Sequence, residues 1–176
     1  AACKGVNAKF EEYYGRFMRL ALYQPDIPQN TGTLIRLCAC LGVPLDIIEP
    51  CGFTFTDKQL RRAAMDYAGE VALQRHNSWA DFVPSMTGRL ILATTRGADP
   101  HLTFAFRPDD IILLGQEGSG VPAEVHDRAD ARLRIPMRTA ARSLNIAIAG
   151  AMILGEALRQ TDGFVTAQSV HKSENC

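Results

Sequence analysis

Short apolar stretches alternate with longer amphipathic stretches along most of this chain. Four to eight consecutive apolar residues between turn residues are typical of strands that are buried on both faces of a parallel sheet. The strands predicted in this way are 20–23, 45–49, 71–74, 89–93, 111–114 and 133–135. Because helical patterns separate them, the chain is predicted to be an α/β protein with a mostly parallel sheet flanked by helices.

The stretches between the predicted strands carry helix start and stop signals. Asn30 or Thr31 is expected to cap a helix that runs to about residue 41 and stops at Gly42. Asp57 is expected to cap a second helix that ends near residue 65. Pro122 favours a short helix to about residue 128, since proline is common at the first helical position. Further helices are predicted over 78–86 and 144–159.

The last predicted helix, 144–159, is apolar on almost every side. Such a helix is buried on more than one side, and in a small domain one side could face a second copy of the chain. Burial within a single chain is the alternative. We therefore predict a homodimer with this helix in the interface, and Ile153 or Leu154 in the contact.

The length of 176 residues and the hydrophobic content of 47% fit one domain with a sizeable core. The pattern assigns 18–165 to this domain, 1–17 to a leader or extension outside it, and 166–176 to a polar tail. The formal net charge is zero, so no overall positive field attracts nucleic acid. A nucleic-acid partner would have to be held by a local basic patch.

The five cysteines are scattered and form neither a CxxC motif nor a paired framework, which favours reduced thiols and a cytoplasmic protein. The four histidines lack the spacing of metal ligands, so we expect no metal site. No apolar stretch is long enough for a membrane span.

Two loops near the C-terminus are the best candidates for a ligand site. Residues 115–122 are rich in glycine and follow a predicted strand, and a glycine-rich turn lets the backbone approach a ligand closely. Ile135, Pro136 and Met137 follow the last predicted strand and offer a rigid apolar wall. Both loops lie at carboxyl ends of strands, where open α/β sheets bind ligands. An uncharged purine ring suits this slot better than a phosphate, although an ordinary strand–helix turn is the alternative for 115–122.

Other candidate residues carry charge. Arg36 lies one and a half turns into the first predicted helix, either at the ligand crevice or on the surface. Glu117 is the best-placed carboxylate, unless it only compensates a helix dipole. Several basic residues could converge to hold phosphates, although each is otherwise a solvated surface charge. They are Lys58, Arg61 and Arg62 on one predicted helix, and Arg96, Arg138 and Arg142 on strand-end loops.

Four segments in order resemble a known family. The first runs from Leu22 to Gly32 and includes Arg36 downstream, the second covers 48–53 and 57–67, and the others are the two loops described above. Over about 18–160, the chain is similar to the SPOUT RNA 2′-O-methyltransferases. Within that family it looks most like the small enzymes that methylate the wobble nucleotide of leucine tRNAs, which is cytidine or 5-carboxymethylaminomethyluridine at position 34.

This resemblance implies a fold, a cofactor and partners. The implied fold threads 115–160 into a deep C-terminal trefoil knot, whereas the pattern alone predicts an unknotted sheet because knots are very rare. The implied methyl donor is S-adenosylmethionine, with S-adenosylhomocysteine as the product, and the implied partners are tRNA and a second copy of the chain.

The resemblance also implies roles for individual residues. The implied cofactor-binding residues are Ala93, Thr94, Gly115, Gln116, Glu117, Gly118, Ile135, Met137, Ser143 and Leu144. The implied catalytic residues are Arg36, Asn30, Ser143 and Glu117. The expected substrate-binding residues are Lys58, Arg61, Arg62, Arg138, Arg142 and Asn145.

The implied reaction is an in-line displacement at the methyl carbon of a sulfonium, which is a good leaving group without a metal. Arg36 is too basic to accept a proton in its charged form, so it is expected to stabilise negative charge on the 2′-oxygen or a nearby phosphate. Two alternatives stay open: a methyltransferase of the same family that acts on another tRNA or rRNA site, and an RNA-binding module without catalysis. Relatives that act on rRNA commonly carry an extra N-terminal RNA-binding domain, and 1–17 is too short to be one, which favours tRNA.

Overall fold

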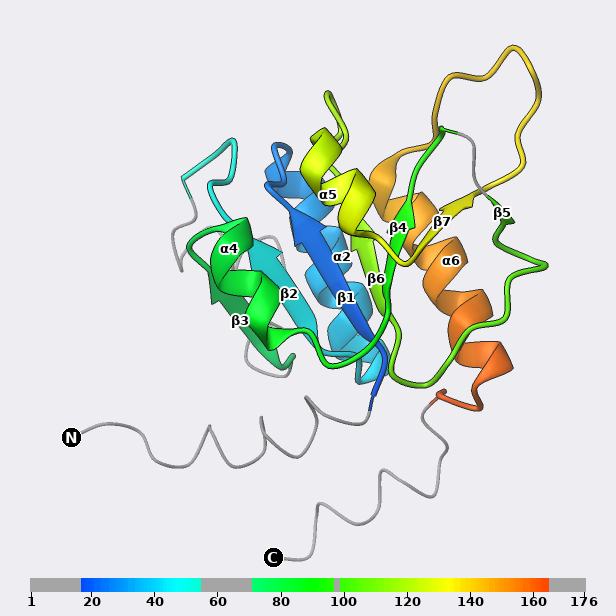
Figure 1. Ribbon diagram of the computed structural model, residues 1–176, viewed down its shortest axis with the longest axis horizontal. Coiled ribbons are helices and arrows are strands. Elements are labelled where there is room, and N and C mark those ends of the chain that lie inside the picture. Colours follow the sequence, from blue (N-terminus) through cyan, green and yellow to red (C-terminus); the bar gives the residue numbers. More distant parts are fainter. Residues whose placement is uncertain (1–16, 55–70, 97–98, 165–176) are drawn as a thin grey trace, which may run out of the picture.

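The structure is a computed structural model that describes residues 17–54, 71–96 and 99–164. In this part of the chain, seven strands form one sheet in the order β3-β2-β1-β6-β4-β7-β5. Every neighbouring pair is parallel. Helices cover both faces of the sheet, as Figure 1 shows, so the predicted parallel α/β architecture is confirmed.

The strands deviate most from the sequence prediction at β3, β5 and β7, and β7 begins two residues earlier than predicted. Their bounds are β1 Arg19–Tyr23, β2 Leu45–Ile48, β3 Leu73–His76, β4 Leu90–Ala93, β5 Asp99–Pro100, β6 Ile111–Leu114 and β7 Ala131–Arg134. The edge strand β3 begins two residues later than predicted, and β5 was not predicted. Both are at least partly exposed, so neither requires the continuous apolar run by which a central strand is recognised.

The starts of α2 and α5 differ from those expected, whereas α4 begins after Ser78 as predicted. Their bounds are α2 Pro28–Leu41, α4 Trp79–Phe82, α5 Ala123–Arg128 and α6 Ile146–Gln160, and a 3₁₀ turn at Val83–Ser85 follows α4. The cap of α2 is Ile27, not Asn30 or Thr31, because Pro28 fits the first helical position. Gly42 ends α2 in the left-handed conformation, with φ of 65°, as expected. The predicted helix at 57–65 lies outside the described residues.

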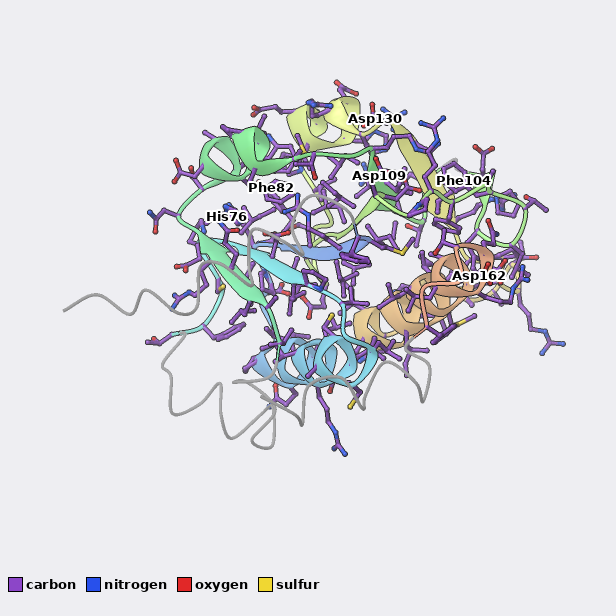
Figure 2. All side chains as sticks on the ribbon, turned by 90° about the horizontal axis from the view of Figure 1, so that it is seen from below. His76, Phe82, Phe104, Asp109, Asp130 and Asp162 are labelled. Carbon is purple, nitrogen blue, oxygen red and sulfur yellow. The ribbon has the colours of Figure 1, made fainter. Side chains whose placement is uncertain are left out.

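Two helix layers enclose the sheet. Figures 1 and 2 show α2 and α6 on one face and α4 and α5 on the other. The α2–α6 side contains the larger apolar core, in which Leu34 of α2 and Leu154 of α6 are packed with Leu114 of β6. The opposite side has a smaller core that includes Phe82 and Val125.

The helix α6 divides its apolar residues between the core and the surface. Ile153 and Leu154 are buried in the core of their own chain, so the expectation that they contact a second copy is wrong. The exposed apolar residues are Leu144, Ile148 and Met152, with 40%, 53% and 42% of their surface accessible. Ile148 and Met152 are four residues apart and therefore lie on one side of α6, whereas Leu144 lies just before the helix begins at Ile146. We call these three residues the exposed stripe.

A group of charged residues is buried on the α4 side of the sheet. Asp46 Oδ1 accepts a hydrogen bond from His76 Nε2 at 2.7 Å, and the other carboxylate oxygen lies 3.4 Å from Arg19 Nη1. Arg19 also donates to the carbonyl of Ser85 at 3.0 Å. Figure 2 labels His76 and Phe82 between β3 and α4, where their rings meet edge to face at 5.1 Å. Arg19, Asp46 and His76 are called the buried cluster below.

No helix in the described part of the chain is long and apolar enough to cross a membrane. Cys38, Cys40 and Cys51, which are the described cysteines, form no disulfide. Burial raises the pKa of Cys51 to about 11 and raises the pKa of Cys38 further, so both thiols stay protonated near neutral pH.

Candidate functional site

A cavity of about 940 Å³ opens where the strand-end loops converge. Its wall comes from the residues that follow β4, β6 and β7 and from the beginning of α6. Leu92, Leu114 and Ile153 provide apolar surface at its base. The carboxyl ends of the parallel strands thus meet at the cavity, as the sequence predicted for a ligand site.

The structure brings most of the predicted site residues together at this cavity. All ten residues predicted to bind the cofactor line it, namely Ala93, Thr94, Gly115, Gln116, Glu117, Gly118, Ile135, Met137, Ser143 and Leu144. Asn30, Arg138, Arg142 and Asn145 also belong to its wall. The expected catalytic and substrate residues on these loops are therefore neighbours of the expected cofactor residues.

Two predicted groups are not on this wall. Arg36 is exposed on α2 and is not among the residues that line the cavity. Lys58, Arg61 and Arg62 lie outside the described residues, so the basic helix that they were predicted to share stays a prediction.

The loop after β6 is folded tightly on itself. Gln116 and Gly120 exchange two backbone hydrogen bonds of 2.9 and 3.0 Å. Gly120 adopts the left-handed conformation with φ of 71°. A Cβ atom on Gly115 would lie 2.8 Å from the carbonyl carbon of Gly120, so any side chain at this position would force the loop to shift.

A chain of hydrogen bonds links three segments at the edge of the cavity. Asn30 donates to Glu117 Oε1 at 3.0 Å, and Asn145 donates to Asn30 Oδ1 at 2.9 Å. Asn145 also caps α6, because its Oδ1 accepts the backbone N–H of Ala147 at 2.8 Å. The side chains of α2, the β6 loop and the start of α6 are thus bonded in series.

Asp26 extends this chain of bonds. Its Oδ1 accepts from the backbone N–H of Glu117 at 3.2 Å, and Glu117 Oε2 accepts from the backbone N–H of Asp26 at 3.3 Å. The pKa of Asp26 is lowered, chiefly by the Glu117 side chain and by backbone N–H donors. Burial and the neighbouring Asp26 raise the pKa of Glu117. Asp26, Asn30, Glu117 and Asn145 are called the cavity cluster below.

Sequence reasoning missed some residues of the wall. Arg96 was recognised as a basic residue at a strand end, but Arg134 and His126 were not considered for the site. Arg134 ends β7, and its position next to the Ile135 loop is a signal that could have identified it. His126 Nδ1 accepts from Arg132 Nε at 3.1 Å, a pairing between α5 and β7 that no local motif indicates.

The charges on the described wall are uneven. Its arginines are Arg96, Arg134, Arg138 and Arg142, whereas Glu117 is the carboxylate on it. No group of three or more histidine, cysteine or acidic residues in the described ranges is arranged to hold a metal ion. The cavity therefore combines apolar walls and backbone edges with a positively charged rim.

Comparison with known proteins relates this chain to enzymes that methylate RNA. Residues 18–155 match the SpoU rRNA Methylase family. The chain is 59% identical over 144 residues to the tRNA (cytidine(34)-2′-O)-methyltransferase of Beijerinckia indica, an alignment that covers 80% of this chain and 90% of the relative.

Solved structures give the same relationship for the fold. A structure reported for the 2-OH methylation of C/U34 on tRNA matches with a TM-score of 0.78 and 40% identity, over 83% of this chain and 97% of that one. An AdoMet-bound rRNA methyltransferase from Sinorhizobium meliloti matches with a TM-score of 0.73 and 28% identity, over 81% of this chain and 56% of that one.

Proposed function

Because this chain belongs to the SpoU rRNA methylase family, we propose that it transfers a methyl group from S-adenosylmethionine to the ribose 2′-hydroxyl of nucleotide 34 in tRNA. The observation that carries this proposal is the 59% identity to a tRNA (cytidine(34)-2′-O)-methyltransferase over 90% of that relative. The wall of the cavity supports it, since the residues expected to bind the donor all lie there.

The cavity fits S-adenosylmethionine by size and by chemistry. Its volume of about 940 Å³ lies in the range of small-molecule sites, which are largely apolar with a few polar groups. Ile135 and Met137 give it an apolar wall, and Gly115 exposes backbone without a side chain. When bound, S-adenosylmethionine supplies a methyl group activated by its sulfonium charge, and S-adenosylhomocysteine is the expected product.

The positive rim suits RNA better than it suits the donor. The donor itself carries a net positive charge, so its binding does not account for the four arginines on the wall. RNA phosphates are attracted by the same arginines, with an energy that falls as salt rises. We therefore assign Arg138 and Arg142 to the tRNA backbone, with Asn145 beside them, and extend this assignment to Arg96 and Arg134.

Arg36 is assigned to the substrate side of the reaction. Its exposed position on α2 allows contact with bound RNA, and it does not line the donor cavity. A guanidinium stabilises negative charge on the 2′-oxygen or on an adjacent phosphate without accepting a proton. Ser143 and Asn30, which line the cavity, are assigned to the arrangement of the reacting groups.

We also propose that the protein is a homodimer and that the exposed stripe of α6 lies in the interface. Exposed apolar side chains that gather on and just before one helix are typical of a contact surface. A two-fold interface would pair this stripe with itself and would also duplicate the predicted basic residues Lys58, Arg61 and Arg62.

Finer features follow from the same family relationship. We propose that 115–160 forms the trefoil knot, which agrees with the insertion of β6 between β1 and β4 and with the packing of α6 on α2. We propose leucine tRNAs as substrates and a cytoplasmic location, where the free thiols of the described cysteines would stay reduced.

Transfer to position 34 is tested with purified protein, labelled S-adenosylmethionine and two forms of one leucine tRNA. The first form carries ribose at nucleotide 34, and the second carries 2′-deoxyribose there. Labelling of the first form and none of the second is expected. Equal labelling of both forms would assign the activity to another nucleotide. Binding of tRNA without labelling of either form would favour an RNA-binding module.

A further inference from the structure

Three loops from distant parts of the sequence meet at Asp26. The loop after β2 approaches it through Gly52, whose backbone N–H donates to the carbonyl of Pro25 at 2.9 Å. A Cβ atom on Gly52 would lie 2.7 Å from Asp26 Cβ, so the two loops are in close contact only because residue 52 lacks a side chain. The loop after β6 reaches the other side of Asp26 through Glu117.

The bonds between Asp26 and Glu117 are reciprocal. Each carboxylate accepts the backbone N–H of the other residue, at 3.2 and 3.3 Å. The arrangement resembles a capping box, in which two side chains satisfy each other's backbone donors, except that here the partners are 91 residues apart. It therefore fixes the position of one loop relative to another, rather than the end of a helix.

The reciprocal contact between Asp26 and Glu117, which we call the joint, lies between the donor cavity and the helix that carries Arg36. Glu117 belongs to the wall of the donor cavity, whereas Asp26 precedes α2, the helix that carries Arg36. Glu117 is also bonded to Asn30, and Asn30 to Asn145, so the joint is continuous with the cap of α6. Asp26 itself is not part of the cavity wall.

We propose that Asp26 is a positioning residue for methyl transfer, which fixes the β6 loop, and with it the donor, relative to the start of α2. This proposal rests on the proposed function. Reactions of this type depend strongly on geometry, because small displacements of the reacting groups reduce the rate severely. The competing explanation is that the joint only stabilises the fold. It predicts that each variant loses activity in proportion to its loss of thermal stability.

The test is a double-mutant cycle of Asp26→Ala and Glu117→Ala. Methyl transfer to tRNA is measured at saturating donor and tRNA, donor affinity is measured by calorimetry, and the melting temperature is recorded for each variant. Loss of a hydrogen bond to a charged group should lower the rate by about 10- to 100-fold in Asp26→Ala. Because both side chains hold the same joint, the double variant should lose little more than the worse single variant.

Two further variants separate positioning from stability. Asp26→Asn keeps an oxygen that accepts the Glu117 N–H, and it should recover part of the rate lost in Asp26→Ala. Asp81→Ala, on the exposed surface of α4, is the matched control and should leave both rate and donor affinity unchanged. Rates are compared well below the lowest melting temperature, so that unfolding does not contribute.

The outcomes separate this proposal from the proposed function. Non-additive losses of rate with partial rescue by Asp26→Asn support positioning. Additive losses, or losses that vanish well below the melting temperature, overturn it. If the wild-type protein methylates no tRNA, the proposed function fails on its own. In that case, donor affinity tests the role of Asp26. Non-additive weakening of donor binding in the double-mutant cycle supports this role, and unchanged donor affinity in Asp26→Ala overturns it.

Discussion

The buried cluster and the cavity cluster use the same kind of bonding in two different surroundings. Each joins segments that are far apart in the sequence through carboxylates and their hydrogen-bond partners. In the buried cluster, Arg19 and Asp46 are 1% and 0% exposed, and helix α4 covers that side of the sheet. In the cavity cluster, Asn30, Glu117 and Asn145 line a space that a ligand can enter.

The difference shows what access to a ligand adds to a polar cluster. A sealed ion pair is retained only while every charge has its partner, since an unpaired buried charge is costly. Polar groups on a cavity wall face the same requirement, but a ligand or the RNA is able to supply partners there. Changes in the buried cluster should therefore alter stability, and changes around the cavity should alter binding and rate.

The largest effect is expected from Asp46→Ala. This change leaves the Arg19 guanidinium buried without its carboxylate, and such a loss costs about 3–5 kcal/mol of the free energy of unfolding. Chemical denaturation of the purified protein measures it, with the exposed Asp99→Ala as the control. A loss below about 1 kcal/mol, the range of surface ion pairs, would mean that the cluster is not sealed from water.

The next effect is a loss of reaction rate with no loss of stability. Arg36→Ala should lower methyl transfer by about 100- to 1000-fold, the usual cost of removing a group that stabilises developing charge. Donor affinity and melting temperature should stay near those of the wild type, because Arg36 is exposed and does not line the cavity. Arg36→Lys should also be impaired, since an ammonium lacks the planar fork of a guanidinium. Near-normal turnover by a folded Arg36→Ala variant would rule out this role.

A smaller effect is expected from overpacking the β6 loop. Gly115→Val places side-chain atoms against Gly120, and relief of such a clash costs about 1–3 kcal/mol, which we expect to appear as about 5- to 150-fold weaker donor binding. Calorimetric titration with S-adenosylmethionine measures the change. Gly155→Ala is the matched control, because a Cβ atom there would have nothing within 4 Å. Wild-type affinity in Gly115→Val would mean that the donor binds elsewhere.

The central strands and the donor loops could be predicted because their signals are local. The run 111–114 has the same bounds in the structure as in the prediction, since four apolar residues in a row fit a strand covered on both faces. The glycine-rich loop follows it directly, and its tight backbone requires the glycine at position 115. The fold class and these loops of the cavity wall were therefore accessible from short stretches of sequence, whereas Ala93, Thr94, Ser143 and Leu144 were predicted from the family resemblance.

The features that escaped prediction depend on distant contacts. The partner of Asp26 is 91 positions away and is held through backbone N–H groups, which no side-chain motif encodes. Asn30 was expected to cap α2, but its side chain is used by Glu117 and Asn145 instead. The edge strand β5 has only two residues and depends on β7 for its pairing, so its own sequence contains no strand signal.

The helix α6 also contains both buried residues and residues that a partner can contact. Ile148 is 53% exposed, whereas Leu154 is fully buried in the core. Ile148→Glu should raise the dissociation constant of the proposed dimer about tenfold or more, as at other apolar contact residues, with little change in the melting temperature of the monomer. Light scattering across a dilution series measures the change. Leu154→Glu should instead lower the melting temperature, because it places a charge in the core. An active wild-type monomer at micromolar concentration would refute the dimer.

The smallest effect concerns the positive rim of the cavity. Its arginines lie on the cavity wall, where RNA can contact them, whereas Arg19 is buried. Arg138→Glu and Arg142→Glu together should weaken tRNA binding. They should also flatten the plot of log affinity against log salt by about 0.9 or somewhat less for each phosphate that the protein no longer neutralises. Arg107→Glu, at an exposed position that does not line the cavity, is the control for one charge reversal and should leave the slope nearly unchanged. If the rim variants kept the wild-type slope, other residues would have to bind the phosphates, and Lys58, Arg61 and Arg62 would be the next to reverse.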